Sequence, residues 1–174
     1  MSKQVILWSS LIVPWLTLLF MKRENIKRYM PVALLAIVTS VLIYDTGITI
    51  GLWIIQETVF PFNQLMPFLF GAMPVLTMWV LNFTFGRFGA YMFTNLILDI
   101  GFNFILLDIF LPNRDIMGLS VPPYKTLPIT LTHAVLLYRY QIWQENIWIT
   151  GERKSLSAAV QPVAAKPSPE DNEG

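Results

Sequence analysis

Long apolar runs separated by short polar breaks dominate residues 1–149 of the chain. A helix needs about 20 mainly apolar residues, within a range of roughly 17–25, to cross the hydrocarbon core of a bilayer. Four runs reach that length and predict membrane-spanning helices, at residues 5–21, 31–55, 65–85 and 89–111. The pattern therefore predicts an all-α integral membrane protein.

A fifth run, at 126–143, is less regular because threonines, His133, Arg139 and Gln141 dilute its apolar character. It fits either a fifth span or a helix lying at the membrane interface. From 150 to 174, Ala, Pro, Ser and acidic residues replace the large apolar side chains, and such a composition buries too little apolar surface to offset the entropy of ordering. We predict one membrane-embedded domain at 1–149 and a disordered tail at 150–174.

Prolines and charges suggest where the helices begin and bend. The basic segment 22–30 is predicted to be a loop, and Pro31 then suits the N-terminus of the second helix, where its missing N–H does no harm. Pro14 predicts a kink in the first helix, which packing in a membrane tolerates. Pro67 and Pro74 predict that the third helix is bent.

The distribution of positive charge predicts the orientation, because cytoplasmic loops carry an excess of Lys and Arg. With five spans and the N-terminus outside, nine Lys and Arg residues lie on the cytoplasmic side and three outside. With four spans the ratio becomes five to seven. We therefore predict five spans, an external N-terminus and a cytoplasmic C-terminus. The residues with most influence on this topology are those of the first basic segment: Lys22, Arg23, Lys27 and Arg28.

Composition excludes several classes of protein. Hydrophobic residues make up 55% of the chain and charged residues 13%, about half the charge of an ordinary soluble domain. The formal net charge of +1 suggests no nucleic-acid partner. The chain has no cysteine and one histidine, which excludes disulfides, thiolate metal sites and histidine-rich metal centres. No HExxH, P-loop, GxSxG or GxGxxG motif occurs, so we expect neither an enzyme nor a bound cofactor or metal.

Polar side chains in the fourth apolar run are the best candidates for a functional site. Asp99 lies near its middle, where a carboxyl group costs roughly 2.5–3.5 kcal/mol on insertion scales. Asn95 and Asn103 lie four residues before and after it and so share its helical face, and His133 of the fifth run is the predicted partner. These residues form either a proton, ion or substrate path, or hydrogen bonds that join helices.

Two further features lie in the second apolar run. Asp45, one turn from Thr49, either extends the polar site or faces a hydrated vestibule. Gly47 and Gly51 form a small-xxx-small pattern, which is typical of close helix packing.

The string Lys27-Arg28-Tyr29-Met30-Pro31-Val32-Ala33, with the chain length and the spacing of the apolar runs, carries a resemblance. Over residues 22–148 the chain resembles a family of small multi-pass membrane proteins of uncharacterised function from spore-forming Gram-positive bacteria. The resemblance implies a multi-pass protein of the bacterial plasma membrane. It supplies no activity and no site residues.

Two functions follow as hypotheses. The first is a non-enzymatic multi-pass membrane protein that acts through helix packing, with the lipid bilayer, a second copy of itself or another membrane protein as partner. The alternative is a small transporter or an ion- or proton-conducting protein that uses the Asp/Asn/His site, which for so few spans implies a homo-oligomer. A membrane-bound hydrolase is least favoured, because no nucleophile or oxyanion donors can be named.

Overall fold

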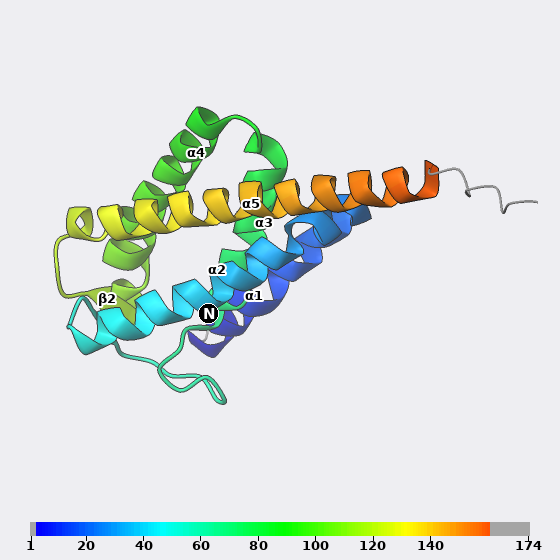
Figure 1. Ribbon diagram of the computed structural model, residues 1–174. Helices are drawn as coiled ribbons and strands as arrows, with labels where there is room; N and C mark the ends of the chain where they lie inside the picture. The colour runs from blue at the N-terminus through cyan, green and yellow to red at the C-terminus, as the bar shows by residue number, and fades with distance from the viewer. Residues whose placement is uncertain (1–2, 161–174) are drawn as a thin grey trace, which may run out of the picture. The chain divides into compact units, whose positions relative to one another are not determined.

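The computed structural model describes residues 3–160, and the side chains of residues 3–147. The chain divides into two units, Met1–Gln141 and Ile142–Gly174, which are considered separately. The described part of the second unit is the continuation of the last helix. The first unit holds all the other elements (Figure 1).

Helices account for most of the described chain. Four helical segments are long and apolar enough to cross a membrane: Lys3–Phe20, Arg23–Thr49, Pro67–Thr84 and Phe88–Arg114. They confirm the four predicted helical runs. The helical elements, including short 3-10 turns and the π-helix η3, are α1 (Lys3–Thr17), η1 (Leu18–Phe20), α2 (Arg23–Thr49), η2 (Pro67–Leu69), α3 (Ala72–Thr84), α4 (Phe88–Ile100), η3 (Gly101–Phe110), η4 (Pro112–Arg114), η5 (Pro123–Lys125) and α5 (Leu127–Val160).

The fifth predicted run forms α5, which is not among these four segments. Its first part packs inside the first unit, where the Tyr91 hydroxyl donates to the carbonyl oxygen of Ala134 at 2.9 Å. The helix continues to Val160, so it extends past residue 150, where we placed the start of the tail. Residues 161–174 lie outside the described residues.

The second helix begins earlier than predicted. It starts at Arg23, so 22–30 is not a loop, and Pro31 lies inside the helix instead of at its N-terminus. Arg, Lys and Glu are good helix formers, so the polar segment extends the helix although it ends the apolar run. The third run is broken in place of the predicted bend at its prolines, because Phe70 and Gly71 separate η2 from α3. Pro74 lies in the first turn of α3, where a proline is tolerated.

A glycine ends α2 before the predicted limit at residue 55. Gly51 has a φ of 74°, in the left-handed region that favours glycine. Its N–H donates to the carbonyl of Ile48 at 3.0 Å, and the Leu52 N–H donates to that of Gly47 at 2.8 Å. These two bonds form a Schellman motif, which satisfies carbonyl groups of the last turn. The chain therefore leaves the helix although the next residues remain apolar.

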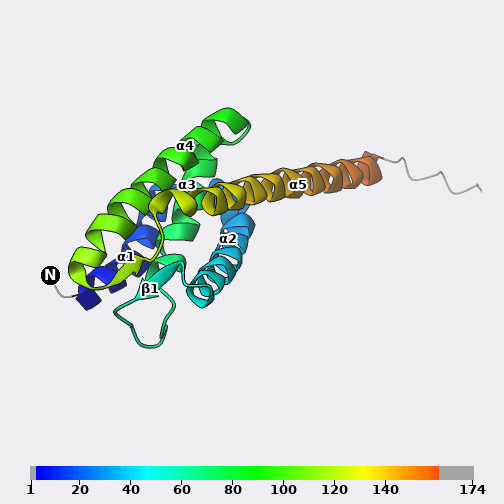
Figure 2. The ribbon, with the colours of Figure 1, turned by 90° about the vertical axis from the view of Figure 1, so that its left-hand side faces the viewer.

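After this turn the chain forms a short strand that hydropathy did not predict. Strand β1 (Trp53–Ile55) pairs antiparallel with β2 (Met117–Leu119), and Ile54 lies opposite Gly118. The Lys3 ammonium lies 3.7 Å from the carboxylate of Glu57 and 3.6 Å from that of Asp115. The start of α1 and the segments after α2 and η3 therefore meet at one end of the helices, where the loop after β1 projects (Figure 2).

The connection from α1 to α2 and the connection from α3 to α4 also lie close together. The Asn25 side-chain amide donates to the side-chain oxygen of Asn82 at 2.6 Å, and the Arg28 guanidinium lies 5.0 Å from the centre of the Phe85 ring. The start of α2 is thus beside the connection from α3 to α4. The four residues expected to have most influence on topology, Lys22, Arg23, Lys27 and Arg28, are all exposed at this end.

Candidate functional site

Five polar side chains inside the first unit line a cavity of about 420 Å³ between α3, α4, η3 and α5, and one of them is the carboxyl group of Asp99. We call it the Asp99 cavity. Its polar lining residues are Thr77, Asn95, Asp99, Thr130 and His133. The other residues that line it are apolar: Met73, Leu76, Val80, Ile97, Leu98, Gly101, Phe102, Ile105, Leu106, Ala134 and Leu137.

Asp99 has a carboxylate oxygen whose hydrogen-bonding capacity is unused. Its Oδ2 atom is buried and has no hydrogen-bond partner among the described residues. The side chain of Thr130, on α5, interacts with the same carboxyl group. A buried carboxylate oxygen without a donor costs free energy, so this oxygen needs a partner that the described chain does not supply.

Asn95 lines the Asp99 cavity, and the nitrogen of its side-chain amide is already hydrogen-bonded. Its Nδ2 donates to the carbonyl oxygen of Tyr91, one turn earlier on α4, at 2.9 Å. Its Oδ1 is therefore the part of the side chain that can accept a hydrogen bond. Asn95 and Asp99 together present acceptor oxygens on one face of α4.

Asn103 is separated from this pair. Its Nδ2 donates to the Asp99 carbonyl oxygen at 2.8 Å, and its Oδ1 accepts a hydrogen bond from the Thr126 hydroxyl at 2.5 Å. The helix changes from α to π winding at Gly101, and the wider turn directs Asn103 toward Thr126. Asn103 is 1% exposed and lines a different cavity, so the predicted continuous stripe of three residues is divided between two sites.

His133 lines both cavities but is not hydrogen-bonded to Asp99 among the described residues. Its Nε2 lies 2.6 Å from the Thr39 hydroxyl oxygen, which joins α5 to α2. The structure therefore brings Asp99 and His133 to the same cavity without the predicted direct pairing. Thr130, one turn before His133 on α5, interacts with Asp99 instead.

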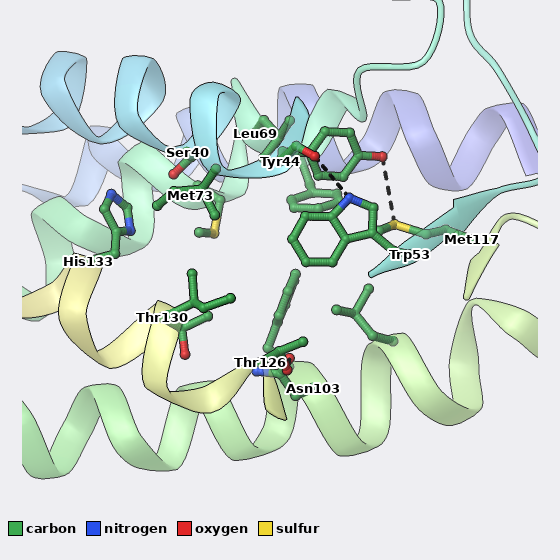
Figure 3. Close-up of a pocket in the computed structure, with 15 residues that line it drawn as sticks. Ser40, Tyr44, Trp53, Leu69, Met73, Asn103, Met117, Thr126, Thr130 and His133 are labelled. Carbon is green, nitrogen blue, oxygen red and sulfur yellow. Dashed lines mark hydrogen bonds between the residues drawn. The ribbon is translucent and has the colours of Figure 1, made fainter. Parts of the chain in front are cut away.

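The second cavity, of about 70 Å³, lies among α2, β1, η3 and α5, and we call it the Ser40 cavity (Figure 3). Ser40 is 4% exposed, and its hydroxyl has no hydrogen-bond partner among the described residues. Tyr44 and Trp53 cover one side, with stacked rings 5.6 Å apart and the indole N–H donating to the Tyr44 carbonyl at 3.1 Å. The cavity is mainly apolar and holds no acidic side chain among its described lining residues.

The three residues singled out in the second run line neither cavity. Asp45 does not extend the polar site and is exposed, which leaves the alternative of a hydrated vestibule. Gly47 packs against the indole ring of Trp53, where a Cβ would overlap the ring. Gly51 lies beyond the end of α2 and forms its cap, so the two glycines do not make a small-xxx-small helix interface.

Sequence reasoning missed Ser40, Thr126 and Thr130. Hydroxyl groups in apolar helices usually bond to a carbonyl of their own helix, so these residues give little signal. Their spacing was the available clue, because Thr126, Thr130 and His133 recur at the interval that places side chains on one helical face.

Replacement of Thr126 by valine is expected to lower the free energy of unfolding by about 1–3 kcal/mol, because the buried Asn103 Oδ1 loses its donor. Thr132→Val is the matched control, since Thr132 is exposed and its hydroxyl bonds to the Pro128 carbonyl of its own helix. Thermal unfolding of the purified protein in detergent measures both. Equal effects of the two substitutions would show that the bond between Asn103 and Thr126 adds no stability.

No group of three or more His, Cys, Asp or Glu side chains able to hold a metal occurs in the part of the chain that the structure describes. Comparison with protein-family models, with curated proteins and with solved structures gives no match.

Proposed function

We propose that the chain is a multi-pass plasma-membrane protein with five spans, an external N-terminus and a cytoplasmic C-terminus. Four helices have the length and composition for this. The fifth, α5, is less apolar, but its first part contacts α2 through His133 and Thr39, and α4 through Ala134 and Tyr91, so neighbouring helices cover part of its polar surface, including His133. The meeting of alternate connections at opposite ends supports this up-and-down arrangement.

Within this protein, the Asp99 cavity is the proposed site of a non-enzymatic binding function of the small-transporter class. The observation that carries the proposal is the buried Oδ2 of Asp99, which lies without a hydrogen-bond partner in the described chain at the wall of a cavity large enough for a ligand. Charged side chains within membrane helices are costly and usually mark a ligand or ion pathway.

The hydrogen bonds between helices support the same conclusion. Two neutral pairs join helices: Asn103 with Thr126, and Thr39 with His133. Neutral pairs of this kind supply the packing role without the cost of a carboxyl group. Asp99 also contacts α5 through Thr130, but its Oδ2 has no hydrogen-bond partner among the described residues, and a ligand-binding role accounts for this atom.

The packing function remains the second candidate, because those two pairs also favour it. It predicts that every polar position is closed to water, whereas the binding function predicts a hydrated Asp99 cavity and a dry Asn103. The two functions therefore predict different water accessibility at Asn95 and Asp99, while both predict that Asn103 is closed to water.

Single-cysteine labelling separates the candidates, since the native sequence contains no cysteine. We expect Asn95→Cys, Asp99→Cys and His133→Cys, which lie at the Asp99 cavity, to react with a small membrane-impermeant thiol reagent, and Asn103→Cys to react more slowly or not at all, because Asn103 is buried outside this cavity. Protection of all four positions would contradict the binding function and support packing.

Three control positions calibrate the labelling. Lys125 is exposed in the segment before α5, so Lys125→Cys should react in intact cells, whereas Lys27→Cys should react only after the cells are opened. Phe93 is 64% exposed on α4 and is proposed to face lipid, so Phe93→Cys should remain unlabelled. Reaction of Lys27→Cys in intact cells would contradict the proposed orientation.

A further inference from the structure

The composition of the Asp99 cavity limits what it can bind, provided that the proposed binding function is correct. Among its described lining residues Asp99 is the one acidic side chain, and none is Lys or Arg. The remaining polar lining residues are Thr77, Asn95, Thr130 and His133. A ligand that complements this wall carries a single positive charge.

The apolar part of the wall indicates the rest of the ligand. Most of the lining residues are aliphatic and come from α3, α4, η3 and α5. The volume of about 420 Å³ falls within the roughly 300–1,000 Å³ of typical small-molecule sites. A bare metal cation is not suited to this wall, because hard cations take six or more oxygen ligands.

The cavity also has a side that faces away from the other helices. Ile97, Leu98 and Ile105 line it and are 54%, 38% and 63% exposed. In the proposed membrane arrangement these side chains contact acyl chains, so an apolar molecule can reach the cavity from within the bilayer.

We propose that the Asp99 cavity binds lipophilic amines in their protonated form. The ammonium group would donate to the Oδ2 of Asp99 and to the Oδ1 of Asn95, whose Nδ2 is already engaged with Tyr91. The apolar body would lie against the aliphatic wall between α3 and α5. The amine is recognised by its charge and enters from the bilayer.

A matched pair of probes tests this inference: 1-aminoadamantane, an amine with a compact apolar cage, and 1-adamantanol, its neutral counterpart. Equilibrium binding of radiolabelled amine is measured to wild-type protein in nanodiscs of zwitterionic phosphatidylcholine, with protein-free nanodiscs subtracting partition into lipid. We expect saturable binding of the amine and no competition by the alcohol. Competition by the alcohol at equal concentration would overturn the proposal and show an apolar site for neutral molecules or acyl chains.

Two substitutions test whether the carboxylate that binds the ammonium group is that of Asp99. Asp99→Asn keeps the shape of the side chain and is expected to weaken amine binding by about tenfold or more. Asp108→Asn removes an exposed carboxyl group from η3 and should leave binding unchanged. Equal affinity of the wild type and Asp99→Asn would overturn the proposal. If Asp99→Asn does not fold, the competition between amine and alcohol on the wild type remains decisive.

The binding assay tests the lipophilic amine as ligand, and the labelling experiment tests the proposed binding function, so each proposal can be refuted without the other. Labelling at positions 95 and 99 without amine binding would refute the lipophilic amine as ligand and leave the hydrated binding site supported. Protection of both positions together with absent amine binding would refute both. Saturable amine binding that depends on Asp99 would support the inference whichever residues water reaches.

Discussion

Gly71→Ala is expected to destabilise the helix bundle by about 3 kcal/mol, near the upper end of the usual cost of overpacking. A Cβ at Gly71 would overlap the carbonyl oxygen of Ser10 and the Cα of Leu11, which belong to the backbone of α1. A backbone cannot move aside as the end of a flexible side chain can, so α1 would have to separate from α3. Thermal unfolding of the purified protein in detergent, with recovery of the monodisperse form, measures the loss.

The contacts beside Gly71 show how much would be lost with that separation. The Trp15 indole donates to the Phe70 carbonyl oxygen at 3.0 Å, and the Trp79 indole donates to the Thr17 hydroxyl at 3.0 Å. Both bonds link α1 to the segment that contains Gly71. Gly89→Ala is the matched control, because an added Cβ would meet no atom within 4 Å apart from the nearby backbone of its own helix. An equal loss in both variants would show that the close approach of α1 is not what the glycine permits.

Trp53→Ala is expected to cost roughly 3 kcal/mol or more, as truncation of a large aromatic side chain in a core does. The Trp53 side chain stacks on Tyr44, fills the space above Gly47 and covers the Ser40 cavity. Alanine would leave this volume empty and remove the hydrogen bond to the Tyr44 carbonyl. Phe93→Ala, which truncates a ring that is 64% exposed, should cost much less.

A pair of cysteines reports the local consequence of this substitution. Ile54 and Gly118 lie opposite each other in the two-stranded sheet, at a separation typical of disulfides. Ile54→Cys with Gly118→Cys should form a disulfide under mild oxidation, and Trp53→Ala should slow its formation. Unchanged crosslinking together with unchanged thermal stability would show that Trp53 does not hold the two strands together.

Hydropathy predicted the helical segments because a bilayer selects for long apolar runs, and this selection is visible in a single sequence. It did not predict where helices begin and end. Arg23 starts α2 because charged residues continue a helix readily, and Gly51 ends α2 because the Schellman motif needs a left-handed residue. Both features lie in the sequence, but hydropathy does not reveal them.

The candidate site was predictable in part for a similar reason. Asp99 was identified from the cost of a carboxyl group in an apolar helix, and that argument needs no structure. The placement of Asn103 needed the structure, because its side chain depends on the π winding that begins at Gly101. The structure was also needed to identify Thr39 as the partner of His133, because Thr39 is distant in sequence and carries no local signal.

The pairing of β1 with β2 has a consequence for the order in which the protein is made. Trp53–Ile55 leaves the ribosome before Met117–Leu119, and both α3 and α4 are synthesised between them. The first strand therefore has no pairing partner until the later segments have been synthesised and placed. The two-stranded sheet that closes this end of the molecule therefore cannot form until Met117–Leu119 has been made.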